Sequence, residues 1–159
     1  CRAWPVSFYG EIAQRIYENT GWHGFVCGVN KEFDLGEQIK NICHAPLENY
    51  AGRTSLKELA WLLAKSKILI CNESGAAHIA TAVGTSTVSI VGGGHFGRFV
   101  PYPKIPGSIN KFEAVFQKMP CYGCNWECIY PIKKNEPAPC ITTISVDAVW
   151  EKVKPLLPC

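Results

Sequence analysis

The sequence predicts an α/β fold, a Rossmann-like domain with a doubly wound parallel sheet. Short apolar, β-rich runs alternate with helical patterns of about three turns through the first 91 residues. Two of these runs lead directly into a helix start with polar side chains, at Gly28 to Glu32 and at Asn72 to Ala80. The 159 residues, 47% apolar and 18% charged, have the composition of one globular domain that can bury a core.

The first half of the chain gives two helix–strand units. Pro5 suits a first helical turn and Gly21 a helix end, and residues 6–19 between them carry apolar side chains at helical spacing. A strand over 22–28 then ends on glycine, a second helix covers 31–40, and a short strand covers 41–44.

The second half continues the alternation and then changes character. Ser55 and Glu58 form a capping-box pattern that opens a helix over 56–65. A strand over 67–71, a helix over 74–83 and a strand over 86–91 follow, and further elements are expected at 114–116 (strand) and 146–157 (helix, capped by Ser145). Residues 119–140 are rich in Cys and Pro and predict an irregular segment within this single domain of residues 1–159.

Bulk properties exclude several function classes. The formal charge is +3 and no block of Lys or Arg stands out, so nucleic acid is not an expected partner. Apolar runs fall short of the roughly 20 residues that a spanning helix needs, so membrane association is peripheral at most. Nine cysteines are many for this length, but the α/β pattern supplies a core by itself, which favours a reduced, cytoplasmic protein over a disulfide scaffold. Cys27, Cys43 and Cys71 fall in expected strands as small apolar residues, and the terminal Cys1 and Cys159 are uninformative.

The start of the chain indicates a piece of a longer protein. Arg2-Ala3-Trp4-Pro5 runs into a helix without a strand before it, whereas an α/β unit ordinarily opens with a strand. We expect a strand, or a whole domain, to precede Cys1.

The strand–helix turn at Asn72 to Ala80 is the most informative motif. In an open parallel sheet, ligands bind at the carboxyl ends of the strands, and the N–H groups of a helix start favour phosphates. The small residues around Gly75 leave room for such a ligand. The other interpretation is a tight junction in which Ser74 caps the helix and His78 is a satisfied polar residue.

Two further strand ends carry weaker signals. In Gly92-Gly93-Gly94-His95-Phe96-Gly97-Arg98, the glycines allow the backbone to approach a ligand and the basic residues to meet an anion, although a flexible turn explains them as well. Glu32, at the other strand end, has the place of a ribose-binding carboxylate, although it also suits the positive end of a helix dipole.

Four segments together resemble one family. They are Arg2 to Pro5, Gly28 to Glu32, Arg53 to Leu59 and Glu73 to His78, in the order and spacing of the bacterial lipopolysaccharide heptosyltransferases. The chain resembles the C-terminal domain of glycosyltransferase family 9, most specifically in Ser74-Gly75-x-x-His78. The likeness covers most of the chain.

The resemblance implies the donor-binding half of an inverting GT-B enzyme, which transfers a heptose-like sugar from a nucleoside diphosphate (ADP-heptose type) to the lipopolysaccharide core at the inner face of the bacterial inner membrane. The acceptor site and the catalytic base would lie in an N-terminal domain absent from this chain, which alone would be inactive. No metal would be required. The implied donor contacts are Arg2 (diphosphate), Glu32 (ribose), Thr54 (adenine), and Glu73, Ser74, Gly75 and His78 (phosphates and sugar). Glu73 departs from the family, in which Asp is commoner, and this leaves the donor sugar open.

The Cys-rich segment, residues 119–140, suggests a possible metal site. The spacing Cys121-x2-Cys124-x3-Cys128-x11-Cys140 could supply four thiolates to a structural zinc ion or, less readily, an iron–sulfur cluster. Free thiols or disulfides in an irregular loop are the alternative, and they are favoured slightly over a metal site. Two rival functions therefore stay open beside the transferase: a nucleotide-sugar-binding module without catalysis, and a metal-binding interaction domain.

Overall fold

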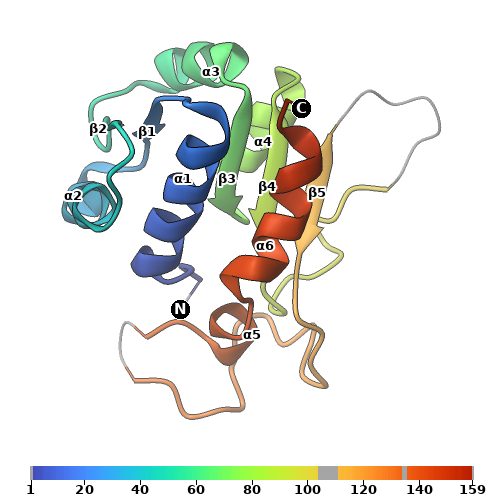
Figure 1. The fold of residues 1–159 in the computed structure, drawn as a ribbon. Coiled ribbons are helices and arrows are strands. Elements are labelled where there is room, and N and C mark those ends of the chain that lie inside the picture. Colours follow the sequence, from blue (N-terminus) through green and yellow to red (C-terminus); the bar gives the residue numbers. More distant parts are fainter. Residues whose placement is uncertain (1, 104–110, 134–135, 159) are drawn as a thin grey trace.

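All strand pairings among the residues that the structure describes are parallel. A computed structural model describes residues 2–103, 111–133 and 136–158, so Cys1 and Cys159 lie outside the described residues (Figure 1). One sheet has the order β3-β4-β5, formed by Ile68–Asn72, Ser86–Ile90 and Phe112–Val115. In the other, β1 (Gly24–Val26) pairs with β2 (Leu47–Asn49). The α/β class with parallel strands is confirmed.

The strand order fits a doubly wound fold with one position open. In the order 3-2-1-4-5-6, β2 and β1 take places 3 and 2, and β3, β4 and β5 take places 4, 5 and 6. Within the described ranges, no hydrogen-bonded ladder joins β1 to β3. Place 1, between these two strands, is not filled by a strand of the described residues.

Helices cover both faces of the larger sheet. In Figure 1, α1 (Val6–Thr20) and α6 (Val146–Val153) lie in front of the strands and α4 (Gly75–Ala82) lies behind them. α3 (Leu56–Lys65) packs against α4, and α2 (Phe33–Ile42) packs against α1. The remaining elements are short: α5 (Pro139–Thr142) and the 3-10 turns η1 (Asn30–Glu32) and η2 (Lys154–Leu156).

Most predicted elements agree with the structure to within two residues at each end, but one is wrong and two are shorter than predicted. The strand predicted at 41–44 is wrong: α2 continues to Ile42, and the strand is β2. Ile39 and Ile42 are three residues apart, so their apolar pattern also suits a helix. The strand predicted at 22–28 shortens to β1, and the last helix changes to η2 at Lys154, next to Pro155. Cys43 therefore lies beyond a helix end, although it is buried as expected.

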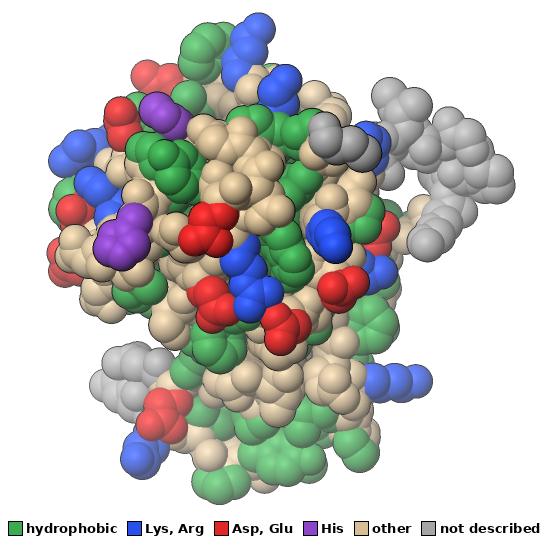
Figure 2. Space-filling model, in the orientation of Figure 1, with side chains coloured by type: hydrophobic (Ala, Val, Ile, Leu, Met, Phe, Trp, Pro, Cys, Tyr) green, Lys and Arg blue, Asp and Glu red, His purple; other side chains and the backbone are tan. Residues whose placement is uncertain are grey.

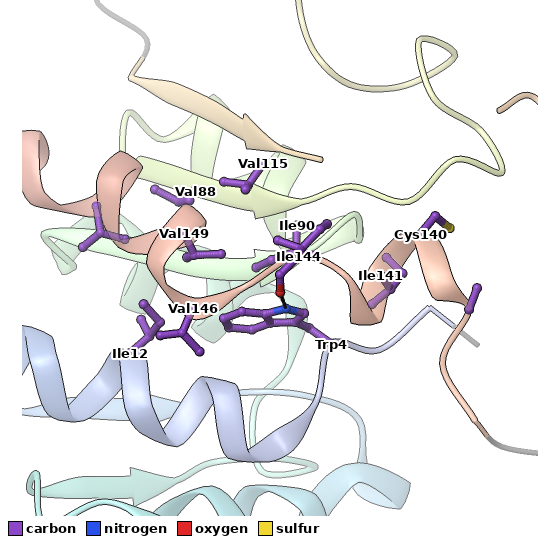
Figure 3. Packing of buried hydrophobic residues seen from close by; sticks show 12 residues of the cluster. Trp4, Ile12, Val88, Ile90, Val115, Cys140, Ile141, Ile144, Val146 and Val149 are labelled. Carbon is purple, nitrogen blue, oxygen red and sulfur yellow. Dashed lines mark hydrogen bonds between the residues drawn. The ribbon is translucent and has the colours of Figure 1, made fainter. Parts of the chain in front are cut away.

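The N-terminal segment is anchored in the core. Figure 3 shows the Trp4 indole among the buried side chains of α1, β4 and α6, with its N–H donating to the carbonyl of Ile144 at 2.8 Å. Trp4 is only 1% exposed, and burial of a side chain of this size stabilises a fold by a few kcal/mol. Its neighbour Arg2 is thereby held close to the sheet.

The face in front of the sheet has mixed charge. Figure 2 shows acidic and basic side chains interspersed over it, without a broad patch of one sign. Arg15 of α1 forms ion pairs with Glu11 and with Asp147, which joins α1 to α6. In the part of the chain that the structure describes, no helix is long and apolar enough to cross a membrane.

Candidate functional site

The turn between β3 and α4 presents an open helix start. The Glu73 N–H donates to the carbonyl of Ile90 at 3.0 Å, which ties the turn to the carboxyl end of β4. Ser74 has the extended backbone of an N-cap (φ −149°, ψ 170°), but its hydroxyl makes no capping hydrogen bond. A methyl group built on Gly75 would meet nothing within 4 Å. The helix start is therefore accessible to an anion, as a phosphate-binding turn requires.

The Glu73 carboxylate is surrounded by basic side chains. Its Oε2 atom is buried and has no hydrogen-bond partner among the described residues. Burial raises the pKa of Glu73 above its ordinary value, and electrostatic interactions with His95, Arg2 and His78 oppose this rise. A buried acceptor without a partner is costly, so this oxygen is suited to a donor from a ligand, such as a sugar hydroxyl.

Arg2 reaches this turn through the anchored N-terminal segment. The backbone N–H of Trp4 donates to Oδ1 of Asn72, directly before Glu73, at 3.1 Å. The Arg2 guanidinium carbon lies 4.9 Å from the ring centroid of Trp126. The structure thus brings Arg2 together with Glu73 and His78, which lie much later in the sequence.

His78, four residues into the turn, has a side-chain partner that sequence reasoning missed. Its Nδ1 is hydrogen-bonded to the Tyr102 hydroxyl, and the two rings meet edge to face with centroids 5.7 Å apart. The alternative interpretation of His78 is a satisfied polar residue, and the structure supplies Tyr102 as its partner. No pattern signals Tyr102, which is 24 residues away in a Pro-rich loop.

Glu32 and Thr54 lie in a second pair of neighbouring loops, after β1 and β2. The Gly52 N–H donates to the carbonyl of Gly28 at 2.8 Å, which joins the loops. Glu32 Oε2 accepts a hydrogen bond from the Val29 N–H at 2.9 Å, so one carboxylate oxygen serves the helix start and the other remains for a ligand.

A groove borders the second loop. Its volume is about 240 Å³, and it is lined by Tyr50, Arg53, Thr54, Glu58, Trp61 and Leu62. A flat base could enter between such side chains. No described contact joins this pair of loops to the β3–α4 turn.

The glycine run after β4 packs against aromatic rings of the Cys-rich segment. A methyl group on Gly92 or Gly94 would lie 2.5 or 2.4 Å from the Trp126 ring, and one on Gly93 would lie 2.5 Å from the Tyr122 ring. The absent side chains make room for the Cys-rich segment. This loop has two basic residues. His95 interacts electrostatically with Glu73, whereas the Arg98 guanidinium lies over the Phe99 ring, 5.2 Å from its centroid.

The four cysteines line one small cavity. Cys121, Cys124, Cys128 and Cys140 surround a space of about 10 Å³, room for roughly one water molecule. The Gly93 N–H donates to Cys140 Sγ at 3.4 Å, and burial raises the pKa of the Cys140 thiol. Among the described residues, no group of three or more His, Cys, Asp or Glu side chains is arranged to hold a metal ion. The thiols are thus not arranged around a metal position in this structure, and the zinc site remains a prediction from the sequence.

Comparison with known families identifies the chain. The model of glycosyltransferase family 9 (heptosyltransferase) matches residues 2–125. The chain belongs to this family. Both groups of candidate residues lie within the matched range, whereas most of the Cys-rich segment lies beyond it.

Curated relatives agree with the assignment. The chain is 29% identical over 117 residues to the lipopolysaccharide core heptosyltransferase OpsX of Haemophilus influenzae, a match that covers 72% of this chain and 33% of that protein. It is 28% identical over 95 residues to lipopolysaccharide heptosyltransferase 2 of Salmonella typhimurium, covering 57% of this chain and 27% of that protein. The matches thus span about a quarter to a third of the relatives' length.

Solved structures share the fold. An ADP-heptose lipopolysaccharide heptosyltransferase II from E. coli superimposes with a TM-score of 0.70 at 20% identity, over 98% of this chain and 42% of that one. A family 9 glycosyltransferase from Veillonella parvula gives 0.71 at 18% identity, with the same coverage. The family 9 chain therefore has the fold of one half of a GT-B heptosyltransferase, and the match to heptosyltransferase II is to its C-terminal half.

Proposed function

We propose that this chain is the donor-binding part of an inverting heptosyltransferase, which holds ADP-heptose while the sugar is transferred to the lipopolysaccharide core. The observation that carries the proposal is the buried Oε2 of Glu73, which has no partner among the described residues and is flanked by Arg2, His78 and His95. Such a site offers an acceptor for sugar hydroxyls and positive charge for a diphosphate.

In this proposal, each group of residues binds one part of the donor. The open helix start at Ser74 and Gly75 receives phosphate oxygens, and Arg2 supplies the countercharge. Glu32 accepts from the ribose hydroxyls with its remaining oxygen, and Thr54 with the adjacent groove holds the adenine. These groups make a divalent metal unnecessary.

The chemistry needs charge stabilisation more than a nucleophile in this chain. In an inverting transfer the acceptor hydroxyl attacks the anomeric carbon and the nucleoside diphosphate leaves with the bonding electron pair. Negative charge then grows on a phosphate oxygen, where N–H donors, Arg2 and His78 stabilise it. A base that removes the acceptor proton is expected in the N-terminal domain, so this chain alone binds the donor without transferring it.

The open position in the sheet is consistent with a strand from the N-terminal part of the enzyme. A strand from the preceding part of the enzyme would fill the position between β1 and β3. We place the whole enzyme in the bacterial cytoplasm, peripheral to the inner face of the inner membrane, where a lipopolysaccharide acceptor would be available.

Calorimetry of this chain with ADP in EDTA tests the proposal. Binding without a divalent cation, and tighter binding of ADP-heptose than of ADP, is the expected result. Binding that appears only with magnesium, or equal preference for UDP- and GDP-sugars, would contradict it. A chain that binds the sugar nucleotide and gives no transfer when reunited with its upstream half would instead be a binding module.

A further inference from the structure

We propose that Trp126 in the Cys-rich segment is a positioning residue of the donor site, whose indole ring holds the Arg2 guanidinium where the diphosphate is bound. This rests on the proposed donor-binding function and extends it to a segment outside the matched family region, since the match ends at residue 125.

The contact has the geometry of a cation–π interaction. The guanidinium carbon lies 4.9 Å from the ring centroid, within the roughly 6 Å over which a cation is attracted to an aromatic face, and tryptophan gives the strongest such attraction. The His95 ring meets the same indole edge to face, with centroids 6.2 Å apart. Two of the three basic residues that act on Glu73 are therefore neighbours of Trp126.

Backbone hydrogen bonds hold the Trp126 ring in a conformation that is energetically unfavourable in itself. The N–H groups of Gly123 and Asn125 donate to the carbonyls of Gly93 and Gly94 at 2.8 and 3.0 Å. Asn125 and Trp126 have positive φ angles of 51° and 67°, which are uncommon for residues other than glycine. The Trp126 indole N–H is also buried without a partner in the described part of the chain.

These unfavourable features indicate that the position of the Trp126 ring is retained for its contacts with neighbouring residues. The ring packs on the backbone of Gly92 and Gly94 and has Arg2 on it. Arg2 is exposed and its long side chain has many rotamers, so an aromatic surface limits its freedom before a ligand arrives. Preorganisation of this kind increases affinity without a direct contact between Trp126 and the ligand.

A double-mutant cycle on this chain tests the proposal, with ADP and adenosine as probes. Trp126→Leu should weaken ADP binding about two- to fivefold, the range of an exposed cation–π contact, and Arg2→Ala should weaken it more. In the Arg2→Ala background, Trp126→Leu should have no further effect. Adenosine, which lacks phosphate, should bind the wild type and Trp126→Leu equally. Trp22→Leu, before the amino end of β1, is the matched control and should leave both affinities unchanged.

The alternative outcomes are distinct. Additive losses of the two substitutions, or an equal loss of adenosine affinity, would mean that Trp126 only supports the fold and would overturn the proposal. If Trp126→Leu does not fold, Trp126→Phe replaces it in the cycle, with a smaller loss expected and the same absence of effect without Arg2. If Arg2→Ala weakens ADP binding and neither Trp126 variant does, the positioning role alone fails. If the wild type binds no ADP, the donor-binding function fails as well.

Discussion

The Tyr102 hydroxyl is hydrogen-bonded to Nδ1 of His78, so a loop after β4 controls a side chain on the first turn of α4. When the hydroxyl donates this bond, the neutral imidazole carries its proton on Nε2. His78 can then donate to a phosphate oxygen without becoming charged. Burial raises the pKa of Tyr102, which keeps the hydroxyl protonated at neutral pH.

Tyr102→Phe should lower the affinity for ADP by about 0.5–1.5 kcal/mol, because the His78 ring loses the bond that fixes its tautomer and orientation. Calorimetric titration measures the effect. Tyr17→Phe on α1 is the control and should bind ADP like the wild type. An unchanged affinity for Tyr102→Phe would mean that His78 does not depend on this partner.

His78→Ala should reduce the affinity for the sugar nucleotide by roughly 1–3 kcal/mol, the loss expected for a hydrogen bond to a charged phosphate. The melting temperature should change little, since the ring is only half-buried. Thermal melts and titrations on the same protein distinguish this from a structural role. A large fall in melting temperature with wild-type affinity would exclude the phosphate contact.

Gly75→Ala should weaken ADP binding without lowering stability. The added methyl group meets no protein atom within 4 Å, and alanine is more favourable than glycine in a helix, so the stability should stay the same or rise slightly. A phosphate on the helix start would meet that methyl group, and we expect a loss of about 1 kcal/mol or more. Unaltered binding would place the diphosphate elsewhere.

Glu32→Gln should weaken ADP binding by roughly 1–3 kcal/mol, because a charged acceptor for the ribose hydroxyls is lost. The fold should tolerate the change, since the Gln side-chain carbonyl can still accept from the Val29 N–H. Titration with ADP and with 2′,3′-dideoxy-ADP measures it: the variant should lose affinity for ADP only. A lower melting temperature with unchanged affinity would limit Glu32 to the helix start.

Glu73→Gln should stabilise the ligand-free chain at pH 7 relative to the wild type, and this advantage should shrink as the pH approaches 4. Because the folded pKa of Glu73 lies above its unfolded value, the native state binds more protons between the two values. The free energy of unfolding of the wild type therefore falls as the pH rises through that window, and Gln removes this dependence.

Urea unfolding across pH 4–7 checks the sign. Glu58→Gln is the opposing control: hydrogen bonds from Ser55 lower the pKa of Glu58, so that carboxylate stabilises the fold at neutral pH and loses its effect on acidification. Parallel curves for the wild type and Glu73→Gln would mean that Glu73 is not destabilised by burial.

The alternation of apolar runs was enough to predict the fold class, because buried parallel strands and amphipathic helices leave strong periodic signals. The capping box at Ser55 and Glu58 was predictable for the same reason: the spacing determines the contact. β2 was missed because Leu47-Glu48-Asn49 is mostly polar and pairs on one side only. Chain order alone also could not show that β1 and β3 belong to separate ladders.

Within the site, the helix start at Ser74 and Gly75 was predictable from local sequence, since a strand followed by small residues defines it. The surroundings of Glu73 and His78 were not. Tyr102, His95 and Trp126 reach these residues through tertiary packing of loops, for which spacing carries no information.

The contact between Gly94 and Trp126 limits how this protein can change. A methyl group at position 94 would lie 2.4 Å from the indole, so a larger residue there requires a smaller ring at position 126. Single substitutions at either position therefore meet an obstacle that paired substitutions avoid. In other members of the family, the side-chain sizes at the two positions should therefore covary. Some members should have glycine at position 94 with tryptophan at position 126, and the rest should have a larger residue at position 94 with a small residue at position 126. Lineages of the second kind would have to hold the basic residue at position 2 by another means.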